Sequence, residues 1–167
     1  WRVVLGQYDI LGLISVFTIQ LKLVMKALVT EVEGAGDKVQ WDKPVSKDLR
    51  NRFLGILQQL LLLKKTQFPR CVVPPGRDLD EKPGLLMLAD GSQSAFCALA
   101  YLRTKMKDGS YQCRLIAGKT RVAPSKKISV PRMELMAALT AVRLAKTVQE
   151  GLRCEIGNRW FCTDNSA

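Results

Sequence analysis

Three acidic residues occupy positions from which their carboxylates can converge. Asp90 ends an apolar run that begins at Leu85, and Asp164 ends an aromatic, β-prone run that begins at Arg159. Each run predicts a strand whose carboxylate emerges at its C-terminal end, into a turn. Glu134 lies in the first turn of a predicted helix. Two strand ends and one helix start can meet at one point although the residues are distant in sequence.

Carboxylate oxygens are the ligands that hard cations such as Mg²⁺ prefer, and two such ions can clamp both oxygens of a displacement at phosphorus. An acid in the first turn of a helix can instead do no more than complement the helix dipole, so this simpler role stays open for Glu134. The chain contains no His, which excludes Ser-His-Asp and Cys-His catalysis. An aspartic peptidase needs Asp-Thr/Ser-Gly, whereas Asp90-Gly-Ser and Asp164-Asn-Ser have the wrong order.

The helix that carries Glu134 begins at Pro131, a residue suited to the first helical position. Its apolar residues recur at helical spacing and form two sides. Leu135, Leu139 and Val142 lie on one side; Ala138, Ala141, Ala145 and Val148 form a small-residue stripe in line with Glu134. The stripe predicts a helix that packs closely on a flat sheet, with Glu134 at the edge of the contact.

The chain divides by composition into a helical part and an α/β part. Helical patterns at 13–29 and 46–65, the second with Ser46 as a predicted N-cap, give a helical region over residues 1–70. Residues 71–84, rich in Pro and Gly, predict a linker. Residues 85–167 then predict strands at 85–90, 95–103, 111–118 and 159–163, a hairpin turn at 107–110, and the helix from 131. The expected class is α/β, a mixed sheet with a helix on one face.

Basic residues concentrate beside the predicted acidic site. The net charge is +11, and residues 85–167 carry 13 Lys/Arg against 6 Asp/Glu. One acid-free stretch holds five cations, which are Lys119, Arg121, Lys126, Lys127 and Arg132. The stretch is either a solvated loop or a patch that neutralises nucleic-acid phosphates. Its position just before the Glu134 helix favours the phosphate patch.

Cysteine usage and hydropathy bound the environment. The five cysteines show no CxxC spacing, and Cys97, Cys113 and Cys162 fall in predicted strands, which predicts buried free thiols in a reducing compartment. The apolar run from Ile10 to Gln20 is too short to span a membrane and leads into lysines, so no membrane partner is expected.

The order of these features resembles a known family. The segments WDKPVSKDLRNRF, LADGSQSAFCALAYLR, KTRVAP, PRMEL and FCTDNS, together with others from Tyr8 to Ser166, resemble the polyprotein of BEL/Pao-type LTR retrotransposons, the Pao retrotransposon peptidase family. The resemblance implies the end of a reverse transcriptase, of thumb or connection type, over residues 1–70. It implies a ribonuclease H-like domain over residues 85–167.

The resemblance also implies an activity and its partners. A ribonuclease H-type endonuclease hydrolyses the RNA strand of an RNA/DNA hybrid with two Mg²⁺ ions, Mn²⁺ being an alternative. Asp90, Glu134 and Asp164 would be catalytic and metal-binding, with Asp90 bridging both ions, and Asn165 and Ser166 would join the five cations in binding nucleic acid. The rest of the reverse transcriptase polyprotein would be a partner, in a cytoplasmic virus-like particle or in the nucleus. The alternative class is an inactive nucleic-acid-binding or structural remnant of a retroelement.

Two departures from the family qualify this expectation. The family commonly has Asp-Ala-Ser where this chain has Asp90-Gly91-Ser92, and a Gly here is expected only to loosen the turn. The ribonuclease H fold continues beyond the position of Ala167 with a helix, a strand and a segment that carries a fourth carboxylate. We therefore expect residues 1–167 alone to be weakly active or inactive, and less stable than a complete domain.

Overall fold

The computed structural model describes residues 9–33 and 44–164, and these belong to two compact units. The first unit contains the described residues from Val16 to Phe68. The second contains Asp9–Ser15 and the chain from Pro69 onward. The division after Phe68 places residues 71–84 together with the sheet, and Val72 and Val73 pack against its core.

The first unit is helical. Helix α2 spans Ser15–Glu33, α3 spans Lys47–Leu62, and a short 3₁₀ helix, η1, follows at Leu63–Lys65. Their apolar sides form a small core around four buried residues, which are Leu21, Val24, Leu49 and Ile56. Ser46 is the N-cap residue of α3, as predicted, but its side chain does not cap the helix, because its hydroxyl donates to Glu31 Oε2 at 2.9 Å.

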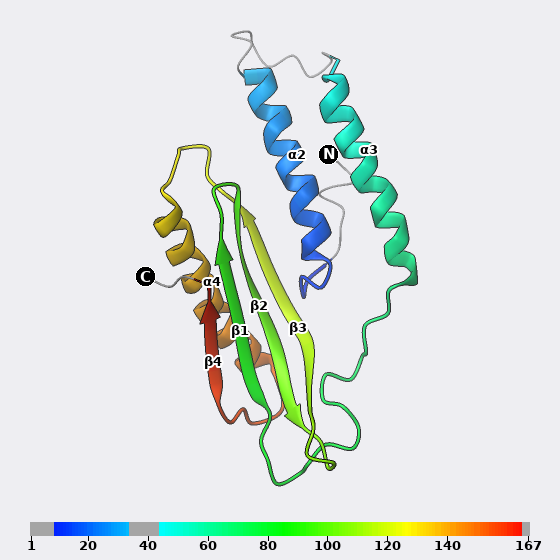
Figure 1. Ribbon diagram of the computed structural model, residues 1–167, viewed down its shortest axis with the longest axis vertical. Coiled ribbons are helices and arrows are strands. Elements are labelled where there is room, and N and C mark those ends of the chain that lie inside the picture. Colours follow the sequence, from blue (N-terminus) through cyan, green and yellow to red (C-terminus); the bar gives the residue numbers. More distant parts are fainter. Residues whose placement is uncertain (1–8, 34–43, 165–167) are drawn as a thin grey trace. The chain divides into compact units, whose positions relative to one another are not determined.

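The second unit is a four-stranded mixed sheet, as predicted (Figure 1). The strands are β1 Gly84–Gly91, β2 Ala95–Lys105, β3 Tyr111–Val122 and β4 Arg159–Thr163. Their order is β3-β2-β1-β4, and only β1 and β4 run parallel. The β2–β3 hairpin turns at Gly109, whose φ of 85° is a conformation that glycine adopts without steric cost.

Helix α4, Val130–Gly151, packs on one face of this sheet (Figure 1). The residues it buries recur every four positions: Met133, Ala137, Ala141 and Ala145. Ala141 and Ala145 confirm the predicted small-residue stripe, and short side chains let the helix lie close to Leu85, Met87 and Ala98 in the core. Leu135, Leu139 and Val142 remain exposed.

Strand alternation separates the two faces of the sheet. In β2 every second residue from Phe96 to Thr104 is buried on the α4 side. The residues between them, Cys97 and Leu99 among them, lie on the other face. The described strands also correct the cysteine prediction. All five thiols are free, as expected, but Cys113 and Cys162 are exposed because both lie on edge strands.

A short segment before α2 covers the outer edge of β3. The carbonyl of Leu11 accepts a hydrogen bond from the N–H of Gly118 at 2.6 Å. Gly12 has a φ of 70°, and a Cβ there would collide with the Gly118 carbonyl. Asp9 holds this segment by accepting hydrogen bonds from the N–H groups of Leu13 and Ile14. One backbone N–H on the outer edge of β3 thereby gains a hydrogen-bond partner. No helix in the described part of the chain is long and apolar enough to cross a membrane.

Candidate active site

Gly91 lies where the end of β1 touches the first turn of α4, the helix that carries Glu134. A Cβ built on Gly91 would lie 2.6 Å from the backbone carbon of Met133 and 2.7 Å from the backbone nitrogen of Glu134. No real side chain tolerates such distances, so only glycine permits this approach at the described helix position. The expectation that Gly91 merely loosens a turn is wrong, because Gly91 is a buried strand residue under the first turn of α4. Asp90 therefore directly precedes the sheet–helix contact.

The parallel pairing of β1 and β4 brings the two aspartates to neighbouring positions. Ala89 pairs with Thr163, and Asp90 and Asp164 each follow by one residue. Paired residues on adjacent strands lie roughly 5 Å apart. Asp164 is the bend residue directly after β4, and its side chain is exposed, as is that of Asp90. The fold thus brings three distant stretches, around residues 90, 134 and 164, to one end of the sheet.

The side chains themselves are less convergent than the backbone. Within residues 9–33 and 44–164, no three His, Cys, Asp or Glu side chains form a group that could hold a metal ion. Asp90 and Asp164 also form no ion pair with any cation in these ranges. The structure therefore places the three acids at the same end of the sheet without bringing their carboxylates into one group, and it leaves Asp90 and Asp164 without a basic counterion from the described chain.

Cys97 is the cross-strand neighbour of Asp90, and its pKa depends on the charge of Asp90. The two residues are paired across β1 and β2, so their side chains share the face away from α4. Burial raises the pKa of the Cys97 thiol, and the negative charge of Asp90 raises it further. A hydrogen bond from the Asp90 backbone lowers the same pKa and offsets part of this effect. Cys97 is therefore a neutral thiol beside the carboxylate at neutral pH.

The donor chemistry of the three acids fits a hard divalent cation. All three candidate ligands are carboxylates, the oxygen donors such ions favour. The absence of a Cβ at Gly91 lets the end of β1 touch the first turn of α4, so the backbones that carry Asp90 and Glu134 lie close together, while the side chain of Asp90 lies on the face away from α4. A soft-metal site is a poorer match, since the only thiol paired with these residues, Cys97, is kept protonated.

The predicted nucleic-acid-binding residues divide into two groups. Lys119 and Arg121 lie in β3, while Lys126, Lys127 and Arg132 lie in the loop before α4 and in its first turn. All five are exposed. Asn165 and Ser166 lie outside the described residues.

Lys119 and Arg121 line a pocket whose third cation, Arg143, was not among the residues predicted from the sequence to bind nucleic acid. It lies between the outer strand β3 and α4, and its remaining residues are Phe96, Met136, Leu139, Thr140 and Arg143. Helical spacing could have indicated Arg143, because Met136, Leu139 and Arg143 lie at i, i+3 and i+7 and therefore share one side of the helix.

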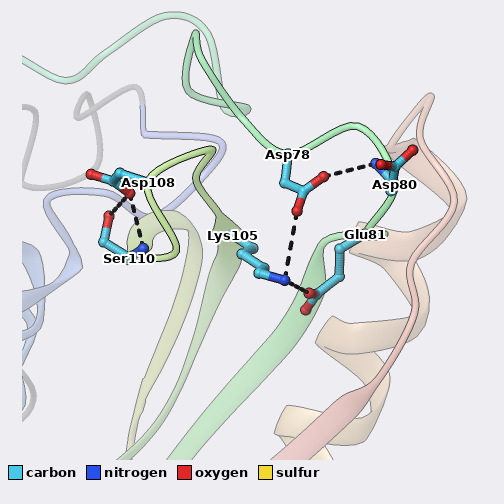
Figure 2. Close-up of polar contacts among 6 residues, drawn as sticks. All are labelled: Asp78, Asp80, Glu81, Lys105, Asp108 and Ser110. Carbon is cyan, nitrogen blue, oxygen red and sulfur yellow. Dashed lines mark hydrogen bonds and ion pairs between the residues drawn. The ribbon is translucent and has the colours of Figure 1, made fainter.

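The opposite end of the sheet carries a different arrangement of charge. Lys105, at the end of β2, contacts Glu81 at 3.1 Å and Asp78 at 3.6 Å between Nζ and carboxylate oxygens. Figure 2 shows this lysine between the two acids. It also shows Asp108, whose carboxylate accepts hydrogen bonds from the N–H and the hydroxyl of Ser110 in the hairpin turn. Hydrogen bonding and charge from Glu81, and then the charge of Asp78, raise the pKa of Lys105. Asp78 and Glu81 are therefore partners of a cation within the fold.

Fold and site together define a ribonuclease H-like α/β domain: a mixed sheet, a helix on its face, and acids at the joint end of β1, β4 and α4. Comparison with protein families makes this specific. The model of the Pao retrotransposon-like RNaseH-like domain matches residues 3–165, and the chain belongs to that family. This confirms both the resemblance to Pao-type retrotransposons and the predicted α/β fold class. The sequence is of Pao-type retrotransposon origin, and its class implies contact with nucleic acid. A comparison with curated proteins finds no match.

Proposed function

We propose that the domain hydrolyses the RNA strand of RNA/DNA hybrids in a reaction that depends on Mg²⁺. One observation carries the proposal: the Gly91 contact and the Ala89–Thr163 pairing bring Asp90, Glu134 and Asp164 to the same end of the sheet. These three residues would hold the metal ions. Bound metal supplies an activated water and stabilises the leaving oxygen at phosphorus.

The chain's own residues divide the remaining work. Asp90 and Asp164 present exposed carboxylates without a basic counterion in the described residues, so they are available as acceptors. Glu134 extends the acidic edge from the helix side. The cations of β3 and of the loop before α4 hold the anionic backbone against this acidic edge, since phosphate contacts supply most of the affinity for nucleic acid. The 2′-OH distinguishes the RNA strand from DNA.

A second candidate is nucleic-acid binding without hydrolysis. It is favoured by one observation: the basic pocket is assembled in the structure, whereas the three carboxylates form no ligand group in the described conformation. This candidate needs the cations alone. It predicts hybrid binding that is the same with and without Mg²⁺.

The test is cleavage of a labelled RNA/DNA hybrid with Mg²⁺ by the chain and by Asp90→Asn. We expect slow cleavage that the substitution abolishes while the circular dichroism spectrum is unchanged. Asp78→Asn, an acid at the other end of the sheet, serves as the matched control and should cleave at the parent rate. Equal cleavage by Asp90→Asn and the parent would remove Asp90 from the site; binding without cleavage in every protein would favour the second candidate.

A further inference from the structure

The pocket between β3 and α4 brings together three cations from separate parts of the chain. In the sheet, Lys119 pairs with Ala98 and Arg121 pairs with Phe96, so both follow the face of β2 that packs on α4. Arg143 reaches the pocket from the helix, three turns after Met133. The three positive charges therefore surround one small space.

No acid balances these charges in the described structure. None of the residues that line the pocket is acidic, and none of the ion pairs among residues 9–33 and 44–164 involves Lys119, Arg121 or Arg143. Like charges that gather without a counterion repel one another, so the arrangement favours an anion from outside. The pocket is an anion site by charge.

The size and floor of the pocket define the anion. Its cavity volume is about 80 Å³. A space of this size admits a small anion such as a phosphate group. Phe96, 4% exposed, and half-buried Met136 form an apolar floor, which strengthens the attraction of the cations for a charge above it. Arginine adds the planar donor geometry that matches phosphate oxygens.

We infer that Lys119, Arg121 and Arg143 form a seat for one backbone phosphate of the bound nucleic acid. The inference deepens the proposed function, because it takes the same hybrid as ligand. Nine residues of helix separate Glu134 from Arg143, or about 14 Å at 1.5 Å per residue. Two strand spacings separate Gly91 from Arg121, or about 10 Å. At about 3.4 Å per base pair the seated phosphate lies roughly three to four base pairs from the acids.

The salt dependence of binding tests the inference. Affinity for a short RNA/DNA hybrid is measured in EDTA between about 50 and 200 mM salt for the parent chain, Arg143→Gln and Arg143→Lys. We expect Arg143→Gln to bind more weakly and to lower the slope of log K against log [salt] by about one. Arg143→Lys should retain most of the slope. Lys146→Gln removes the same charge from the same helix outside the pocket, and should leave the slope unchanged.

Several results would overturn the inference and others would support it. Equal slopes for the parent and Arg143→Gln would overturn it, even if the parent cleaves RNA. A reduced slope for Arg143→Gln would support the inference even if no cleavage is found, because binding in EDTA does not depend on metal. In that case only the proposed nuclease activity would be rejected. An acidic peptide serves as a second probe. If Arg143→Gln loses affinity for this peptide but binds the hybrid like the parent, the pocket belongs to a protein partner and the inference is overturned. Lys119→Gln provides an independent second variant with the same expected decrease.

Discussion

Acids and cations are paired where β1 begins and are kept apart where β1 ends. Around the start of β1, Lys105 joins Asp78 and Glu81, Lys82 joins Glu155, and Lys146 joins Glu150 at the end of α4. Around its end, Asp90 and Asp164 form no ion pair with the described residues. The nearby cations Lys119, Arg121 and Arg143 gather instead in a separate pocket.

The difference distinguishes charges that are paired within the fold from charges that we propose bind a ligand. Exposed ion pairs contribute little to stability, and the pairs at the start of β1 mainly fix the segments that lead into the sheet. Separated groups of like charge bring no such benefit. The functions proposed above assign them external partners of opposite sign: a cation for the acids and a phosphate backbone for the pocket between β3 and α4.

The largest expected effect breaks the joint at the acidic end. Gly91→Ala places a Cβ 2.6 Å from the backbone of Met133, so the start of α4 must move away. We expect a loss of roughly 1–3 kcal/mol in the free energy of unfolding, the usual cost of overpacking. Urea denaturation measures it. Gly151→Ala is the control, because a Cβ at Gly151 meets nothing within 4 Å and should leave the unfolding midpoint nearly unchanged. A parent-like midpoint for Gly91→Ala would show that the close contact is absent.

A second prediction concerns the charge of Asp90. Because this charge raises the pKa of Cys97, Asp90→Asn should lower that pKa toward its ordinary value. More thiolate then exists at a given pH, so alkylation of Cys97 becomes faster. The pH profile of alkylation, followed by mass spectrometry of the Cys97 peptide, measures this. Cys154, in the turn after α4, is the internal control whose profile should not change. An unchanged Cys97 profile would mean that the two side chains do not share a face.

The smallest effect lies at the paired end. Glu81 and Asp78 raise the pKa of Lys105, so its ion pairs stabilise the fold fully below the unfolded-state pKa of about 10.4. This contribution is lost as the pH rises through the higher folded-state pKa. We expect Lys105→Gln to unfold at slightly lower urea than the parent at pH 8, and the difference to shrink above pH 10.4. Lys107→Gln, in the hairpin turn, is the control. A difference that persists undiminished at high pH would show that packing of the Lys105 stem, not its charge, is responsible.

Local signals in the sequence predicted the elements well. The apolar run ending at Asp90, the Asp108-Gly109 turn and the run from Arg159 gave strands and a hairpin close to the observed bounds. Pro131 marked the start of α4 within one residue. β3 continues to Val122, four residues beyond its predicted end, because pairing with β2 continues to Ala95. The alternation of apolar and polar residues and the turn residues act over a few positions, so they can be recognised from the sequence alone.

Features that depend on distant residues were not predictable in the same way. The role of Gly91 requires knowing that the first turn of α4 lies over it, which depends on the packing of two elements about 40 residues apart in sequence. The exposure of Cys113 and Cys162 depends on which strands form the edges. The pocket between β3 and α4 depends on how these two elements pack, so the sequence alone places Arg143 only on one side of a helix.

The most direct test of the acidic site is the position at which a divalent cation binds. Mn²⁺ broadens the NMR signals of nearby nuclei, so a titration of the chain locates the ion without requiring catalysis. We predict broadening centred on Asp90–Gly91, Met133–Glu134 and Thr163–Asp164, and its loss in Asp90→Asn. Broadening centred on Asp78 and Glu81, or equal broadening in the parent and Asp90→Asn, would contradict the account.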